Sequence, residues 1–164
     1  MRNIGAVYHE LKRGCKMGTI YTIGFTKKSA KEFFELLELN GIDFVLDVRL
    51  NNTSQLAGFS KYPDLEYFLK TICNIEYKND IYFAPAESTL KKYKKKEISW
   101  SEYVEEFQQL MQKRGIDKYI VENYSLFREK KVCLLCSEEK ADYCHRRLVA
   151  EMVQKMYGVK IVHL

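Results

Sequence analysis

Apolar and polar residues follow two repeating patterns along this chain, one typical of buried strands and the other of amphipathic helices. The longest unbroken apolar run is 132–136, and its charged flanks predict a short strand that is covered on both faces. β-Branched and aromatic residues predict four further strands, at 19–23, 44–49, 75–77 and 159–163.

Helices are predicted between these strands, where apolar residues recur three and four positions apart. Ser29 with Glu32, and Ser99 with Glu102, have the spacing of capping boxes and so mark two helix starts. The predicted helices begin at Ser29, at Pro63, at Ser88 or Thr89, at Ser99, at Asp117 and at Asp142.

The order of these elements indicates the fold class. The strand–helix–strand pattern of residues 19–49 implies a parallel pair of strands with a right-handed crossover. We therefore predict one three-layer α/β domain over 19–164, with a mainly parallel sheet of about five strands and helices on both faces. Residues 1–18 lack firm periodicity and are interpreted as an N-terminal extension, with Met17 as a candidate start and a short helix over 7–13 as the alternative.

Composition narrows the class of protein further. A chain of 164 residues, 46% hydrophobic and 30% charged, suits one globular domain, and its net charge of +5 is compatible with a phosphorylated or nucleic-acid partner. No apolar run suggests a signal peptide or a membrane span. The five cysteines are irregularly spaced, so we expect free thiols and a cytoplasmic location; the oligomeric state stays open.

Chemically active side chains cluster after the central apolar run. Cys136 ends the run and Glu138 follows it, while Cys144, His145 and Arg146 fall in the first turn of the next helix if Asp142 is the N-cap. On that helix His145 points toward the body of the protein. Free N–H groups at a helix start bind anions, so Arg146 is expected to bind one; the alternative is that it is solvated or pairs with nearby glutamates.

A second group of polar residues follows the predicted strand 44–49. Asp47 and Arg49 are two residues apart, so their side chains share one face of the strand. In open parallel sheets ligands bind outside the carboxyl ends of the strands, where Gly24, Asp47, Arg49 and Cys136 all stand. We expect these residues to form one site; the alternative is an Asp47–Arg49 salt bridge that only orients the next loop.

Three chemistries compete at this site. Cys133, Cys136, Cys144 and His145 match a zinc set by number, but Cys133 and Cys136 should face opposite sides of the sheet, and Cys144 and His145 should diverge on a helix. We therefore predict no metal and no cofactor. Cys144 or Cys136 could act as a thiolate nucleophile, although a phosphatase-type loop would need Arg at position 142, where Asp stands. A Cys136–Cys144 disulfide is a further alternative under oxidising conditions.

General acid–base catalysis is the third chemistry and fits the residue types best. His145, Asp47 and Glu138 can exchange protons, while Arg49 and Arg146 hold a phosphate or carboxylate. These side chains suit either a hydrolase or a group-transfer enzyme, and their types alone do not distinguish the two reactions.

A separate charge run lies over residues 90–96. A solvated helix face is the simplest interpretation, but the interleaved tyrosine also allows contact with nucleic-acid phosphates. The lysines that would make this contact are Lys91, Lys92, Lys94, Lys95 and Lys96.

The chain contains four short motifs: Y-T-I-G, D-V-R followed by Ser, I-S-W-x-E-Y, and L-L-C-x-E with a later C-H-R. They occupy 21–24, 47–49 with Ser54, 98–103, and 134–138 with 144–146. Together they are similar to the motifs of the family called domain of unknown function 488. The resemblance implies an α/β fold with a site at these motifs, without specifying a reaction, and we expect Gly24, Thr26 and Ser54 to contribute to anion binding.

Two positions depart from the family pattern. Phe25-Thr26 stands where the family usually has His-Ser, and Asn52 stands where it usually has Pro. If the replaced His were catalytic, this member would have an altered activity.

The leading hypothesis is an enzyme, a hydrolase or transferase, that acts on a phosphate-bearing substrate such as a nucleotide or nucleic acid. A non-catalytic nucleic-acid-binding module is the alternative, and a zinc-stabilised interaction domain is the third.

Overall fold

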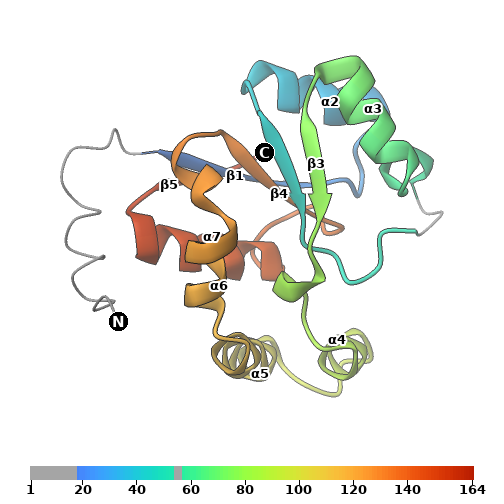
Figure 1. Cartoon of the computed structure of the whole chain (residues 1–164). Coiled ribbons are helices and arrows are strands. Elements are labelled where there is room, and N and C mark those ends of the chain that lie inside the picture. Colours follow the sequence, from blue (N-terminus) through green and yellow to red (C-terminus); the bar gives the residue numbers. More distant parts are fainter. Residues whose placement is uncertain (1–17, 54–56) are drawn as a thin grey trace.

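The computed structural model describes residues 18–53 and 57–164, which form a three-layer α/β domain (Figure 1). The predicted extension therefore lies, except for Gly18, outside the described residues, as does Ser54. Five parallel strands form one sheet in the order β3-β2-β4-β1-β5. The strands are β1 (Thr19–Gly24), β2 (Phe44–Asp47), β3 (Glu76–Asn79), β4 (Val132–Cys136) and β5 (Lys160–His163). The predicted fold class is confirmed.

Strand β4, the apolar run, lies at the centre of the sheet, and all five of its residues are buried. β1 and β2 are parallel to each other, but the direct pairing expected from their order is wrong, because β4 lies between them and pairs with both. The most apolar strand gains most from the central position, where helices cover both faces and strands cover both edges.

Helices cover both faces of the sheet (Figure 1). α2 (Ala30–Leu39) and α3 (Asp64–Cys73) cover one face, and α5 (Trp100–Lys113), α6 (Ile116–Asn123) and α7 (His145–Tyr157) pack on the other. α4 (Glu87–Lys94) packs against α5. Short 3₁₀ helices occupy Gly58–Ser60, Ile81–Phe83 and Ser125–Arg128.

The predicted capping boxes are confirmed at Ser29 and Ser99, but two other predicted helix starts are wrong. α4 has Ala86 as its N-cap, and Thr89 lies inside the helix, where its hydroxyl donates to Glu106. α7 has Cys144 as its N-cap rather than Asp142, because a turn closed by Cys144 N–H to the Ala141 carbonyl, 3.1 Å, precedes the helix.

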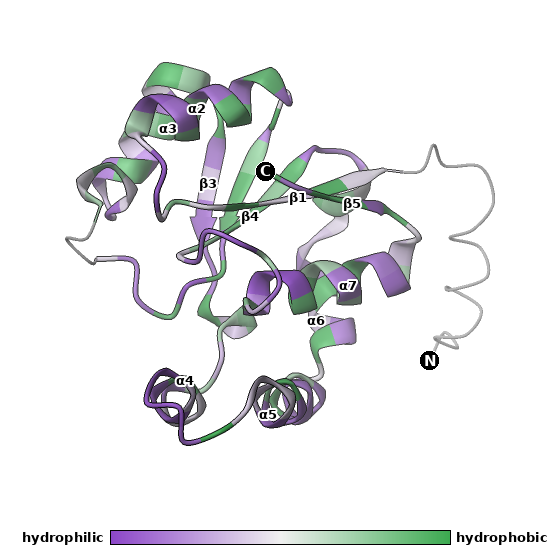
Figure 2. Cartoon of the chain, turned by 180° about the vertical axis from the view of Figure 1, so that it is seen from behind, coloured by the Kyte–Doolittle hydropathy of each residue, from purple (hydrophilic) through white to green (hydrophobic). Residues whose placement is uncertain are grey.

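Alternate residues of each strand enter separate cores on the two faces of the sheet. Leu46, Leu134 and Cys136 pack toward α5 and α7, whereas Val45 and Cys133 pack toward α2 and α3. The predicted opposite orientation of Cys133 and Cys136 is confirmed. The ribbon coloured by hydropathy shows apolar residues along the central strands and alternating apolar and polar stretches along the helices (Figure 2). Because both faces are closed, a site has to form at a strand end.

Asp80, directly after β3, is a buried carboxylate that joins the β3 end to α6. It accepts hydrogen bonds from the hydroxyls of Tyr119 (2.7 Å) and Tyr124 and from the Tyr82 N–H (3.0 Å). Burial alone raises the pKa of Asp80, but the hydrogen bonds from Tyr124, Tyr119 and Tyr82 outweigh it, so its pKa is lowered overall.

We expect Asp80→Asn to lower the free energy of unfolding at pH 7 by about 1–3 kcal/mol, because the charged acceptor of buried donors is lost. Because the pKa of Asp80 is lower in the folded than in the unfolded chain, its ionised form stabilises the fold at pH values above about 3.9, the pKa of an unfolded aspartate. This stabilisation is lost as the pH falls through the pKa of Asp80 in the folded protein. The difference between the variant and the native protein should therefore shrink in acid, as measured by urea unfolding from pH 7 to pH 3. Glu105→Gln, on an exposed position of α5, is the control and should change little at either pH.

Candidate functional site

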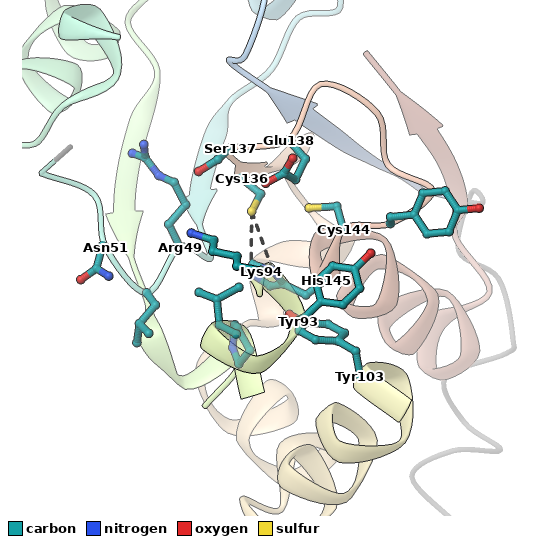
Figure 3. Close-up of a pocket in the computed structure, with 14 residues that line it drawn as sticks. Arg49, Asn51, Tyr93, Lys94, Tyr103, Cys136, Ser137, Glu138, Cys144 and His145 are labelled. Carbon is teal, nitrogen blue, oxygen red and sulfur yellow. Dashed lines mark hydrogen bonds between the residues drawn. The ribbon is translucent and has the colours of Figure 1, made fainter. Parts of the chain in front are cut away.

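A pocket of about 310 Å³ opens at the carboxyl ends of β2 and β4, between α4, α5 and the start of α7 (Figure 3). Among the predicted site residues it is lined by Arg49, Lys94, Cys136, Glu138, Cys144 and His145. Topology explains the position, since β2 and β4 are parallel neighbours and their last residues meet at one edge of the sheet.

Cys136 and His145 face each other at the base of this pocket. The Cys136 Sγ atom lies 3.8 Å from His145 Nδ1 and 3.9 Å from Nε2, and both side chains are buried (Figure 3). His145 Nε2 lies 2.9 Å from the Val48 carbonyl oxygen. Because a carbonyl only accepts, a neutral His145 carries its proton on Nε2, which leaves the Nδ1 lone pair free to accept one. The two nearly equal distances place the Cys136 sulfur between the two ring nitrogens.

Cys144 belongs to the same cluster, contrary to the expectation that it diverges from His145. As the N-cap it has extended backbone angles, φ −129° and ψ 135°, so it does not follow the helical rotation of His145. The thiols of Cys136 and Cys144 and a ring nitrogen of His145 all lie within 4.8 Å of one another. Cys133 lies on the other face of the sheet, outside this cluster.

The two thiols of the cluster differ in acidity. The hydrogen bond from Cys144 lowers the pKa of Cys136, and the Ser137 N–H and the Arg146 charge add to this effect against burial. The same hydrogen bond and burial raise the pKa of Cys144. Cys136 is therefore the thiol that ionises more readily, and Cys144 is its donor.

Asp47 and Arg49 form a buried bidentate ion pair, which is the alternative that the sequence left open. Arg49 Nε lies 2.8 Å from Asp47 Oδ1, and Nη2 lies 2.6 Å from Oδ2. The Tyr77 hydroxyl also donates to Oδ2, at 2.7 Å, and Arg49 Nη2 donates to the Ser60 carbonyl, at 2.9 Å. Burial lowers the pKa of Arg49, but the hydrogen bond and charge of Asp47 outweigh it and raise that pKa. Asp47 thus holds Arg49 at the pocket wall and does not itself line the pocket.

Gly24, Thr26 and Arg146, all expected to contact an anion, instead contact the backbone of the loop after β4. The Thr26 N–H and hydroxyl donate to the Ser137 carbonyl, at 3.1 and 2.6 Å. The Arg146 guanidinium, only 1% exposed, donates to the carbonyls of Glu138 (2.5 Å) and Glu139 (3.1 Å). These residues fix the loop that carries Ser137 and Glu138 to the pocket.

The lysines of the charge run are divided between ion pairs and the pocket. Lys91 pairs with Glu87, Lys92 with Glu106, and Lys95 with Glu97. Lys94 lines the pocket and makes no ion pair within the described part of the chain. Lys96, just past the helix end, has a φ of 59°. The run is therefore not one continuous basic surface.

Several residues that line the pocket were not predicted from the sequence. They are Asn51, Tyr93, Tyr103, Ser137 and Tyr143. Tyr103 ends the I-S-W-S-E-Y motif, which was the available signal, but its spacing is that of an ordinary core position on α5. Its buried ring stacks with those of Trp100 and Phe107 and lies 4.9 Å from that of Tyr93.

Comparison with known proteins gives one family. A sequence model of the family described as "Domain of unknown function DUF488" matches residues 29–153, well over half of the chain and every pocket residue named above. Comparison with curated proteins and with solved structures gave no significant match. Among the helices of residues 18–53 and 57–164, none has the length and apolar character needed to cross a membrane.

Proposed function

This chain belongs to the DUF488 family, and from that premise we propose that it is an enzyme, a hydrolase or transferase, that acts on a phosphate-bearing substrate through Cys136 and His145. The observation that carries this proposal is the contact of Cys136 Sγ with His145 Nδ1, 3.8 Å, at the base of a pocket that also contains two cationic side chains. A nucleophile, a base beside it and a group that orients the base form a recognisable catalytic arrangement.

His145 and Val48 provide the base and its orientation. The Val48 carbonyl holds the ring by the Nε2 proton, so Nδ1 can accept the Cys136 thiol proton. The thiolate then attacks the electrophilic centre of the substrate and forms a covalent thio-intermediate. The departing group takes the proton back from the His145 imidazolium. Water or an acceptor hydroxyl, deprotonated by His145, then breaks the bond to sulfur and restores the thiol.

Lys94 and Arg49 suit the phosphate of the substrate. Lys94 is exposed and lines the pocket, while Arg49 is held at its wall by Asp47. The Cys136 thiol lies between the side chains of Arg49 and Cys144 and is directed toward His145 (Figure 3). The half-buried ring of Tyr93 can stack on a planar base, which favours a nucleotide among phosphate-bearing substrates.

The non-catalytic nucleic-acid-binding alternative has less support. Three of the five lysines, Lys91, Lys92 and Lys95, form ion pairs with neighbouring glutamates. Of the five, only Lys94 lines the pocket. A binding module would instead need a continuous basic surface along α4.

A thermal-shift screen of nucleotides, phosphosugars and short DNA and RNA identifies the ligand class. A ligand at a hundred times its dissociation constant adds about 2.7 kcal/mol of stability, so the shift is easily measured. We expect the Lys94→Ala variant to lose the ligand-induced shift. The control Lys91→Ala should keep it, because Lys91 pairs with Glu87 on the same helix and does not line the pocket. Shifts that appear only with long oligonucleotides and fall equally in both variants would support the binding module.

With a substrate in hand, Cys136→Ser and His145→Gln are each expected to lower kcat/KM by about a hundredfold or more, because nucleophile and base act in the same step. Intact-protein mass spectrometry of quenched reactions should detect the thio-intermediate in the native protein and not in Cys136→Ser. Turnover that survives in both variants, with native circular dichroism spectra, would disprove the proposal.

A further inference from the structure

We propose that Cys136, Cys144 and His145 form a binding site for a soft divalent metal ion of the Zn²⁺ class. One donor atom from each residue lies within 4.8 Å of the other two, and all three side chains are buried. This inference does not depend on the proposed function, because it rests on the three donor atoms alone.

The spacing is close to that of a tetrahedral site. With a Zn–S distance of about 2.3 Å and a Zn–N distance of about 2.0–2.1 Å, tetrahedral angles separate a sulfur ligand from a nitrogen ligand by about 3.6 Å. Cys136 Sγ and His145 Nδ1 are 3.8 Å apart. The separations from the Cys144 thiol lie within 4.8 Å, so rotation of the three side chains has to bring their donor atoms closer together around one ion.

The histidine is already held in the tautomer of a metal ligand. Its Nε2 proton is donated to the Val48 carbonyl at 2.9 Å, which leaves Nδ1 as the nitrogen that is free to bind a metal ion. Histidines that bind metals usually donate their other ring N–H to a carboxylate or a backbone carbonyl in this way. Two thiols and one imidazole are the donors that favour zinc over calcium or magnesium.

The cluster supplies three ligands and borders the pocket, so a fourth position is open to solvent or to a small ligand. Binding converts both thiols to metal-bound thiolates and releases their protons. An ion held on Cys136 blocks that sulfur as a nucleophile, so metal binding and the proposed covalent reaction exclude each other. Reversible inhibition by the ion, unlike the metal site itself, rests on the proposed function.

The test uses the full chain, freed of metal by a chelator under a phosphine reductant and titrated with Co²⁺ as a coloured probe for Zn²⁺. We expect one equivalent of Co²⁺ to give the visible bands of a tetrahedral ion and near-ultraviolet thiolate-to-cobalt bands, and Zn²⁺ to displace it. Cys144→Ser should weaken binding by about a hundredfold or more, beyond the 10–100-fold typical of outer partners. Cys73→Ser, which removes a thiol on α3, is the matched control and should leave the affinity unchanged.

Alkylation gives a second measurement that needs no variant. One equivalent of Zn²⁺ should protect Cys136 and Cys144 from iodoacetamide while Cys73 keeps its reactivity, as read by peptide mass spectrometry. Absence of binding, cobalt spectra without thiolate bands, or unprotected Cys136 and Cys144 would overturn the metal site and leave the proposed function standing. Metal binding by the native protein, together with full turnover in Cys136→Ser, would keep the metal site and disprove the proposed nucleophile.

Discussion

Asp47→Asn is expected to lower the free energy of unfolding by about 3–5 kcal/mol, the range observed when one partner of a buried ion pair is removed. Asp47 is 0% exposed and Arg49 is 3% exposed, so the guanidinium left behind cannot recover its lost partner by hydration. The variant also weakens the acceptor of the Tyr77 hydroxyl. Urea unfolding followed by circular dichroism measures the change.

A surface ion pair provides the control for this prediction. Glu87 and Lys91 lie 2.7 Å apart with both side chains largely exposed, so Glu87→Gln should leave the stability almost unchanged. Asp47→Asn combined with Arg49→Met should recover part of the loss, because no charge then stays buried. A single Asp47→Asn variant as stable as the native protein would show that Arg49 finds another partner or water.

Gly24→Ala is expected to destabilise the fold by about 3 kcal/mol or more, at the upper end of overpacking effects. A Cβ atom at position 24 would lie 1.7 Å from the Glu138 carbonyl oxygen and 2.7 Å from its carbon. This neighbour is backbone, and it is held in place by the Arg146 guanidinium. Residue 24 cannot move away without loss of the β1–β4 pairing, and the Glu138 carbonyl cannot move away without loss of its hydrogen bond from Arg146.

The same substitution should alter the pocket, because the displaced loop follows Cys136 directly. We expect ligand-induced thermal shifts to be lost in Gly24→Ala, even at temperatures where the variant is folded. Gly58→Ala is the control: a Cβ there meets nothing within 4 Å, so its stability should match the native protein. A Gly24→Ala variant with native stability and native ligand shifts would contradict the close approach.

The predictions that the structure confirms are those based on residues close together in the chain. The apolar run 132–136 predicted a strand buried on both faces, and the spacing of Ser29 and Ser99 to their glutamates predicted two capping boxes. The odd offset of Cys133 and Cys136 placed them on opposite faces. Each of these features depends on residues close together in the chain, whose relative directions are set by the local backbone.

Contacts between distant parts of the chain decided the rest. His145 meets the Val48 carbonyl 97 positions away, Thr26 meets Ser137 across 111, and Arg146 meets Thr22 across 124. A guanidinium and a hydroxyl suit an anion or a carbonyl equally well, so the residue types alone could not assign Arg146 or Thr26 to the loop backbone.

The sequence by itself determined which elements form, which faces are apolar and that the reactive residues gather after β2 and β4. Only the tertiary structure decided that β4 separates β1 from β2, that Asp47 and Arg49 pair, and that Cys144 joins Cys136 and His145. The physical reason is that local geometry fixes the direction of a side chain, whereas its partner depends on which distant element packs there.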